Sequence, residues 1–175
     1  VPARGPVIIA PNHQSLLDPW LTGLSLYRRA TYLARDSLFR VPILGWLIRQ
    51  YDALPVEREK TVARAGFDVC LRALELGRAL LLFPEGTRSY DGRLQPLKRG
   101  VALLARRAPA PVLPVWIEGT RGAWPRGQKL PRPGKIRLYF GTPITFGMDE
   151  SSDAFMDRLR KAYQVLATEA GSGDL

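Results

Sequence analysis

The sequence predicts one α/β domain over residues 1–175, with a largely parallel mixed sheet flanked by helices. Short β-branched or leucine-rich runs recur between helical patterns, which is typical of such domains. The run 79–83 is apolar at every position, as expected for a strand that is covered on both faces. With 46% hydrophobic residues the chain can bury one sizeable core, and we find no internal repeat and no second domain in it.

The elements of the first half are mostly short. We expect, in order, a strand at 7–10, a helix at about 19–27, a strand at 31–34, a segment of mixed character at 38–51 and a strand at 53–56. The most regular helix is expected at 59–76, because apolar residues recur there every three or four positions. The only cysteine, Cys70, fits this pattern as a small buried side chain, and Gly77 follows where glycine commonly ends a helix.

In the second half, the strand at 79–83 ends in the polar turn 84–89. We then expect, in order, a helix at 99–107, strands at 112–117 and 136–140, and a last helix that carries Phe155, Leu159, Ala162 and Leu166. The segment 121–135 is rich in proline and glycine, as loops are. Ligands of open α/β sheets bind beyond the carboxyl ends of the strands, where the loops after 7–10 and 79–83 begin.

The chain carries 26 Lys and Arg against 16 Asp and Glu, a formal charge of +10, which predicts an anionic partner. A nucleic acid, an anionic membrane and a phosphorylated substrate all fit this charge. No apolar run reaches the ~20 residues of a membrane-spanning helix, and the chain does not start like a signal peptide. Because it begins at Val1 and its first strand follows within ten residues, we expect a further segment to precede it.

The only histidine, His13, follows the first predicted strand and precedes Asp18 by five residues. Histidine exchanges protons near neutral pH, and an aspartate that accepts its other N–H fixes the tautomer. On a continuous helix five residues turn through about 500°, so the two side chains can meet only if 11–18 is a loop. Asp18 has the residue type of a helix N-cap and Pro19 suits the first turn. The alternative is that Asp18 is only a cap and His13 only a loop residue.

The loop after 79–83 offers a site for an anion. It contains, in order, Glu85, Gly86, Thr87 and Arg88. The glycine permits a tight turn, and the guanidinium can bind phosphate through two N–H groups. Lys98 and Arg58 add cations beside the ends of predicted elements. The alternative is a surface ion pair between Glu85 and Arg88, worth less than ~1 kcal/mol.

Read together, these segments resemble the glycerolipid acyltransferases, and most closely those that act on lysophosphatidic acid. His13 and Asp18 look like the first motif of that family, and 83–89 (FPEGTRS) matches the third almost letter for letter. Parts of 35–58 resemble the second motif, and 112–115 resembles the fourth. Residues 96–100 resemble the basic turn that follows the third motif. Within the second, Arg35 stands where lysine is usual and Ser37 where glutamate is common.

The resemblance implies a glycerol-3-phosphate acyltransferase-like fold and a transfer of a fatty acyl group in phospholipid biosynthesis. The donor is a thioester, acyl-CoA or acyl carrier protein, and the acceptor is the free hydroxyl of 1-acylglycerol 3-phosphate. By resemblance, His13 is the general base and Asp18 orients its ring. The residues implied in acceptor binding are Arg58, Glu85, Gly86, Thr87, Arg88 and Lys98. We expect no metal and no further cofactor, and we interpret Ser15 as structural because it lacks a glycine-flanked nucleophile turn.

The resemblance also implies work on the cytoplasmic side of a membrane, peripherally or through a segment before residue 1. Segment 38–49 mixes bulky apolar residues with arginine, as interfacial segments do, and a buried core helix is the alternative. A basic loop predicts a landing patch for anionic lipid or for CoA phosphates, and a merely solvated loop is the alternative. Its basic residues are Arg121, Arg126, Lys129, Arg132, Lys135 and Arg137.

Two alternative functions stay open. One is acyl transfer to another lysophospholipid or to glycerol 3-phosphate, and the other, in a different class, is nucleic-acid binding. Only the charge supports the latter, because no zinc-ligand pattern, aromatic RNA-binding strand or recognisable basic helix is present. We therefore expect no nucleic acid among the partners.

Overall fold

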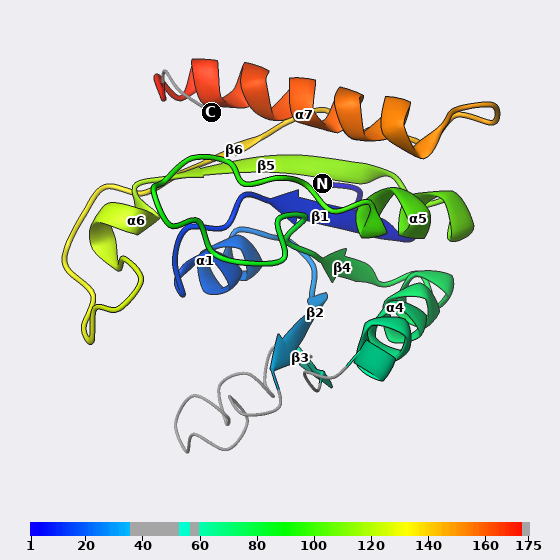
Figure 1. Ribbon diagram of the computed structural model, residues 1–175, viewed down its shortest axis with the longest axis horizontal. Helices are drawn as coiled ribbons and strands as arrows, with labels where there is room; N and C mark the ends of the chain where they lie inside the picture. The colour runs from blue at the N-terminus through cyan, green and yellow to red at the C-terminus, as the bar shows by residue number, and fades with distance from the viewer. Residues whose placement is uncertain (36–52, 57–59, 173–175) are drawn as a thin grey trace.

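The structure, a computed structural model, describes residues 1–35, 53–56 and 60–172 and shows one mixed sheet with helices on both faces (Figure 1). The described strands are β1 (Val7–Pro11), β2 (Ala30–Arg35), β3 (Ala53–Val56), β4 (Ala79–Leu81), β5 (Val112–Glu118) and β6 (Arg137–Phe140). The described helices are α1 (Asp18–Leu24), α4 (Lys60–Glu75), α5 (Gly100–Arg107), α6 (Thr120–Ala123) and α7 (Ser152–Glu169).

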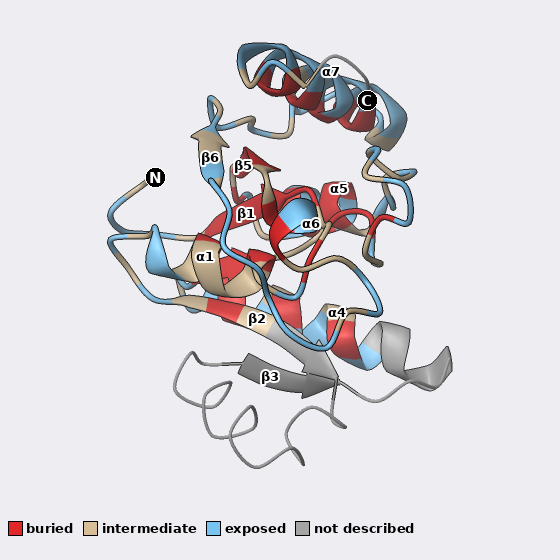
Figure 2. Cartoon of the chain, turned by 90° about the vertical axis from the view of Figure 1, so that its left-hand side faces the viewer, coloured by how far each residue is buried: buried red, intermediate tan, exposed pale blue. Residues whose placement is uncertain are grey.

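The strands lie in the order β3-β2-β4-β1-β5-β6. Every neighbouring pair is parallel except β5 and β6, which run antiparallel with Trp116 opposite Tyr139. The predicted α/β domain with a largely parallel mixed sheet is therefore confirmed. The central strands β1 and β4 are buried at every position, because helices cover the sheet on both sides (Figure 2).

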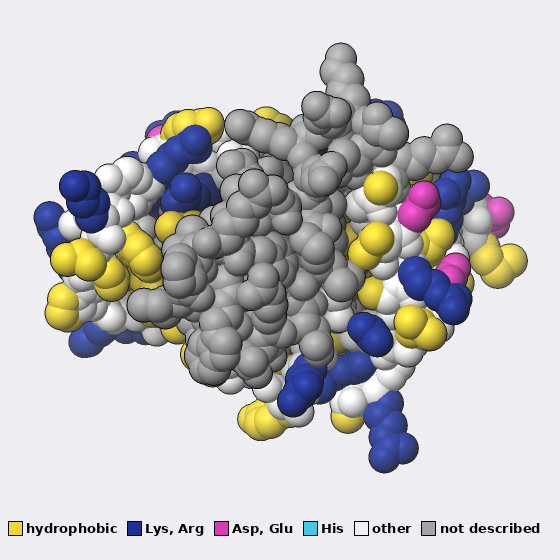
Figure 3. Space-filling model, turned by 90° about the horizontal axis from the view of Figure 1, so that it is seen from below, with side chains coloured by type: hydrophobic (Ala, Val, Ile, Leu, Met, Phe, Trp, Pro, Cys, Tyr) yellow, Lys and Arg dark blue, Asp and Glu magenta, His cyan; other side chains and the backbone are white. Residues whose placement is uncertain are grey.

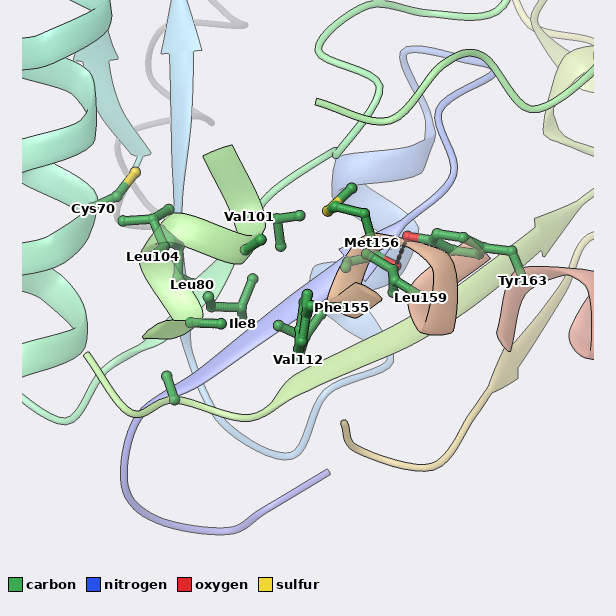
Figure 4. Packing of buried hydrophobic residues seen from close by; sticks show 14 of the residues in the cluster. Ile8, Cys70, Leu80, Val101, Leu104, Val112, Phe155, Met156, Leu159 and Tyr163 are labelled. Carbon is green, nitrogen blue, oxygen red and sulfur yellow. Dashed lines mark hydrogen bonds between the residues drawn. The ribbon is translucent and has the colours of Figure 1, made fainter. Parts of the chain in front are cut away.

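Alternate residues of the central strands serve two separate cores. Ile8 of β1 packs on the face covered by α4, α5 and α7, where Figure 4 shows it close to Leu80, Val101, Val112 and Phe155. Val7 and Ile9 point to the opposite face and join Leu81, Leu113, Val115 and Ile117. A fully buried side chain of this size contributes ~1.5 to 3 kcal/mol, so the two cores together hold the strand order in place.

Helix α7 anchors the core near the centre of the sheet. Its Tyr163 is fully buried, and the hydroxyl donates a hydrogen bond of 2.6 Å to the carbonyl of Ala10 in β1 (Figure 4). The helix begins after Ser151, whose hydroxyl accepts from the backbone N–H of Ala154. The prediction of a last helix through Phe155 and Leu166 is confirmed.

The helix predicted at 59–76 appears as α4, and two of its sequence features behave as expected. Gly77 has a φ of +71° and its N–H donates to the carbonyl of Leu74, which ends the helix. Cys70 is 1% exposed, and burial raises the pKa of its thiol to about 11. The interpretation of Cys70 as a small buried side chain is confirmed.

Two differences from the sequence predictions are informative. β4 ends at Leu81 rather than at Phe83, although the N–H of Leu82 still donates to the carbonyl of Ile9 at 2.9 Å. α6 was not predicted, because four residues give no periodic signal. The segment predicted to be of mixed character, 38–51, lies outside the described residues. In the part of the chain that the structure describes, no helix has the length and apolar composition needed to cross a membrane.

Candidate active site

Two loops leave the same edge of the sheet, one after β1 and one after β4 (Figure 1). β1 and β4 are parallel neighbours, so their carboxyl ends lie side by side. The loops are also bonded to each other. The backbone N–H of Ser89 donates to the carbonyl of His13 at 2.7 Å, and the side chain of Gln14 donates to the carbonyl of Gly92 at 2.8 Å. Segments far apart in the sequence thus form one site.

The ring of His13 is bonded to the carboxylate of Asp18. The Nδ1 atom lies 2.8 Å from Asp18 Oδ2, with the histidine side chain 17% exposed and the aspartate fully buried. Because a carboxylate only accepts hydrogen bonds, Nδ1 carries the proton and the lone pair of the neutral ring is on Nε2. The ring of Phe83 stacks on that of His13, with centroids 4.0 Å apart. The imidazole is therefore bonded by Asp18 at Nδ1 and packed by Phe83 on its face.

Asp18 does not cap α1 as its residue type suggested. Leu17 occupies the N-cap position without a side-chain bond, and Asp18 is the first helical residue. Its Oδ2 atom instead accepts the backbone N–H groups of Gln14 and Ser15, each at 2.6 Å. The carboxylate therefore shapes the loop that presents His13, and it fixes the ring at the same time.

Asn12 and Ser15 support the same loop. The side chain of Asn12 accepts from the N–H of Ile117 at 2.6 Å and donates to its carbonyl at 3.1 Å, which ties the loop to β5. Ser15 is fully buried, and its hydroxyl donates to the carbonyl of Trp124 at 2.8 Å. The structural interpretation of Ser15 is confirmed. Asn12 was missed as a positioning residue, because its partner lies on a strand whose place in the sheet is not visible in the sequence.

Glu85 turns into the protein and bonds to both loops. Its Oε1 accepts the N–H of His13 at 2.6 Å, its Oε2 accepts the N–H of Gln95 at 2.8 Å, and the residue is 2% exposed. Burial raises the pKa of Glu85 to about 7, against the two backbone hydrogen bonds that lower it, and the nearby charge of Asp18 raises it further. That Glu85 binds the acceptor stays a prediction, and its described contacts are with backbone amides.

The turn after Glu85 brings a cation and a glycine together. Gly86 has a φ of +66°, which favours glycine, and a Cβ atom there would lie 2.6 Å from Lys98 Nζ. The N–H of Lys98 donates to the carbonyl of Pro84 at 2.9 Å, which closes the loop on itself. Gly86 and Lys98 are exposed, and Thr87 and Arg88 are half-buried. Arg58, the remaining predicted acceptor residue, lies outside the described residues.

A pocket of about 290 Å³ lies beside α1, the helix that Asp18 begins. Apolar and aromatic side chains dominate its lining, with two arginines. The lining residues are Pro19, Trp20, Gly23, Leu26, Tyr27, Arg28, Arg29, Ala30, Tyr32 and Leu81. Sequence analysis missed this pocket, because its lining comes from α1, from the residues that follow this helix, and from β2 and β4.

The six basic residues of the predicted landing patch are all exposed. Three of them also make contacts within the protein: Arg121 donates to the carbonyl of Tyr90, Arg126 lies over the Tyr90 ring, and Arg137 pairs with Glu118. The contacts of Arg121 and Arg126 place part of this loop against the loop after β4. Among the described residues, no group of three or more His, Cys, Asp or Glu side chains could hold a metal ion.

Comparisons with known proteins identify relatives of this architecture. A family model described as acyltransferase matches residues 1–118. A chloroplast 1-acyl-sn-glycerol-3-phosphate acyltransferase of Brassica napus is 34% identical over 143 residues, which are 79% of this chain and 41% of the relative. A protein of the same name from Bacillus subtilis is 28% identical over 145 residues, covering 82% of this chain and 69% of the relative.

A solved structure is also similar. The crystal structure of the 1-acyl-sn-glycerophosphate (LPA) acyltransferase PlsC from Thermotoga maritima superposes with a TM-score of 0.80 at 28% identity, over 96% of this chain and 68% of that one. The chain spans about 40% of the length of the chloroplast relatives from Brassica napus and Arabidopsis thaliana.

Proposed function

The chain belongs to the acyltransferase family, and on that premise we propose that it transfers a fatty acyl group from a thioester to the free hydroxyl of lysophosphatidic acid. The observation that carries the proposal is the bond between the ring of His13 and the buried carboxylate of Asp18, at the sheet edge where the loop after β4 also begins. The names of the relatives supply the acceptor, 1-acylglycerol 3-phosphate.

In this reaction His13 is the general base. Its Nε2 atom takes the proton from the acceptor hydroxyl while the hydroxyl oxygen bonds to the thioester carbonyl carbon. The carbon–sulfur bond then breaks, the thiolate leaves, and the proton passes from His13 to the thiolate. Asp18 stabilises the imidazolium that forms in between, because its carboxylate is 2.8 Å from Nδ1. The products are phosphatidic acid and a free thiol.

The donor is a thioester of CoA or of acyl carrier protein, with its acyl chain in the pocket beside α1. The pocket is lined by Pro19 and Trp20, which directly follow Asp18, and by Leu81, two residues before the Phe83 that stacks on His13. Each methylene group buried there contributes ~0.8 kcal/mol to binding.

The acceptor phosphate is bound by the turn after Glu85. Lys98 Nζ lies beside the bare Cα of Gly86, so a phosphate can approach the backbone and the ammonium together. Arg88 in the same turn supplies a guanidinium that can bind two phosphate oxygens. Thr87 belongs to the same turn, and Arg58 completes the proposed set.

The first test is a panel of acceptors with the variant Arg88→Ala. A charge-assisted contact is worth ~1.5 to 3 kcal/mol, so we expect kcat/KM for lysophosphatidic acid to fall about ten- to a hundredfold. Arg88→Lys restores it only in part, because the charge returns without the planar fork. Thiol release from acyl-CoA and from acyl carrier protein is measured with lysophosphatidic acid, lysophosphatidylcholine and glycerol 3-phosphate. Arg106→Ala, which removes an exposed positive charge from α5, is the matched control.

Lysophosphatidic acid should be the fastest acceptor in this panel. A faster reaction with lysophosphatidylcholine or glycerol 3-phosphate would replace the proposed acceptor. Thiol release that no acceptor stimulates, together with nucleic-acid binding that falls steeply with salt, would replace the enzyme by the nucleic-acid-binding alternative.

We also propose that the protein works peripherally on the cytoplasmic side of an anionic membrane. Lys and Arg side chains stand beside hydrophobic side chains on the face shown in Figure 3, and the basic loop exposes Leu130 (74%) among its cations. Basic residues next to apolar ones are the composition that anionic lipid surfaces attract.

The expected result of a liposome flotation assay is weak, reversible binding to anionic vesicles. Raising the salt to 1 M shortens the Debye length to ~3 Å and should release the protein. The double variant Lys129→Glu, Arg132→Glu should bind less than the wild type, and Arg106→Ala should bind like it. Equal binding to neutral vesicles would contradict the electrostatic part of the proposal.

A further inference from the structure

We propose that Glu85 is a positioning residue for His13: its carboxylate links the loop that carries His13 to the loop after β4, and it does so only while it is ionised. The inference rests on the proposed acyl transfer, because it gives Glu85 a part in that reaction other than acceptor binding. It is carried by the two hydrogen bonds of the carboxylate and by its burial.

Both oxygens of Glu85 face backbone N–H groups from different segments. Oε1 accepts from His13 at 2.6 Å and Oε2 accepts from Gln95 at 2.8 Å. Only an ionised carboxylate accepts at both oxygens without carrying a hydrogen. A protonated Glu85 carries a hydrogen on one of its two oxygens. The backbone N–H that points at this oxygen then has a weaker acceptor. Protonation therefore weakens one of the two bonds.

The position of the histidine ring depends on this link. Three consecutive backbone amides bind carboxylates: that of His13 binds Glu85, and those of Gln14 and Ser15 bind Asp18. Asp18 Oδ2 also bonds to the ring Nδ1 of His13, so this one oxygen accepts hydrogen bonds from both the loop backbone and the histidine side chain. If Glu85 releases the His13 amide, the loop is held from the Asp18 side alone, and Nε2 loses its fixed direction toward the acceptor hydroxyl.

The surroundings of Glu85 make its charge sensitive to pH near neutrality. Burial, and then the negative charge of Asp18 in α1, raise its pKa to about 7 in spite of the two amide bonds. From α7, the buried Tyr163 faces it, and the charge of Glu85 adds to the burial that raises the pKa of that phenol. Two other titratable side chains belong to residues next to it in these loops: the imidazole of His13, whose backbone N–H bonds to Glu85, and the ammonium of Lys98, which lies beside Gly86.

Binding of the acceptor phosphate by Glu85 fits these observations less well. Both oxygens already accept hydrogen bonds, the residue is 2% exposed, and an ionised carboxylate repels a phosphate. The two roles differ in kinetics. Loss of a phosphate contact raises the acceptor KM, whereas loss of positioning lowers kcat.

The kinetic test compares the wild type with Glu85→Gln and Glu85→Asp across pH. For Glu85→Gln we expect kcat near pH 8 to fall about ten- to a hundredfold, with the acceptor KM within about twofold. Because Glu85 positions His13 only when it is ionised, log kcat/KM of the wild type should fall more steeply on the acid side than that of Glu85→Gln. Glu85→Asp, which keeps the charge, should recover the steeper fall. Glu75→Gln, which removes an exposed carboxylate from α4, is the matched control.

Two measurements test Glu85 without using activity. In the wild type, the amide proton resonance of Gln95 should shift with pH around a midpoint near 7, and in Glu85→Gln this shift should be absent. The second measurement is the pH dependence of the free energy of unfolding, whose sign follows from the raised pKa of Glu85. The folded protein binds this proton more tightly than the unfolded chain, so wild-type stability relative to Glu85→Gln should fall as pH rises from about 4.5 to 7 and level off above.

The outcomes separate this inference from the proposed function. A wild type that transfers no acyl group overturns the proposed function, and the Gln95 resonance and the stability slope then still decide whether Glu85 links the loops. Normal transfer with the same acid slope in Glu85→Gln, or a change in acceptor KM alone, overturns the inference. If Glu85→Gln does not fold, a Gln95 resonance in the wild type that is constant between about pH 5 and 9 overturns it.

Discussion

Replacing His13 with alanine is expected to lower kcat for acyl transfer by about a hundred- to ten-thousandfold while the protein stays folded. A positioned general base contributes a factor of this size, and no second histidine exists to replace it. The fold should survive, because the ring is at the site surface, 17% exposed, and the backbone bonds of residues 13–15 remain.

The measurement is thiol release with lysophosphatidic acid under saturating donor, alongside circular dichroism and thermal unfolding. Leu16→Ala is the matched control, since it shortens a partly exposed side chain in the same loop. Substantial residual turnover by folded His13→Ala would remove His13 from the role of base.

Replacing Asp18 is expected to change both stability and turnover. Asp18→Ala removes the acceptor of two backbone N–H groups, those of Gln14 and Ser15, in a fully buried position. An unsatisfied buried donor costs ~1 to 3 kcal/mol, so the free energy of unfolding should fall by several kcal/mol. Chemical denaturation at fixed pH measures this loss.

Asp18→Asn separates the two roles, because its amide oxygen can keep the backbone N–H groups while the negative charge is lost. The imidazolium then lacks its charged partner, a contact worth ~1.5 to 3 kcal/mol, so kcat should fall about ten- to a hundredfold with little change in acceptor KM. The Asp18→Asn variant should also be less stable than the wild type. Its amide nitrogen takes the place of Oδ1, a buried atom with no partner among the described residues, so the N–H groups have no acceptor. Equal turnover in Asp18→Asn and wild type would show that the charge of Asp18 does not act on the reaction.

Elements whose signal is local were predictable. The three- and four-residue spacing of apolar residues predicted α4, and the continuous apolar runs predicted β1, β4 and β5, because such runs suit strands covered on both faces. The element ends were less accurate. Phe83 lies beyond the end of β4, and its ring stacks on His13, a contact with a different part of the chain that the sequence does not show.

The sequence predicted which residues belong to the site, but it predicted less of how they contact one another. The five-residue spacing of His13 and Asp18 excluded one continuous helix, and the structure places His13 in the loop between β1 and α1 and Asp18 at the first residue of α1. Nothing local shows that Asp18 would also receive two backbone amides, or that Glu85 would turn inward to bond to residues of two loops.

By itself, the sequence determines which side chains follow which strands, and hence that the groups proposed for proton transfer and phosphate binding gather at one edge of a parallel sheet. The order β3-β2-β4-β1-β5-β6 is decided only by tertiary packing, since the buried strands β1, β4 and β5 all present apolar faces and backbone bonds to a neighbour. That order puts β4 and β5 on either side of β1. It thereby brings Glu85 to the amide of His13 and Ile117 to the side chain of Asn12, and burial in that position, rather than residue type, sets the pKa of Glu85 near 7.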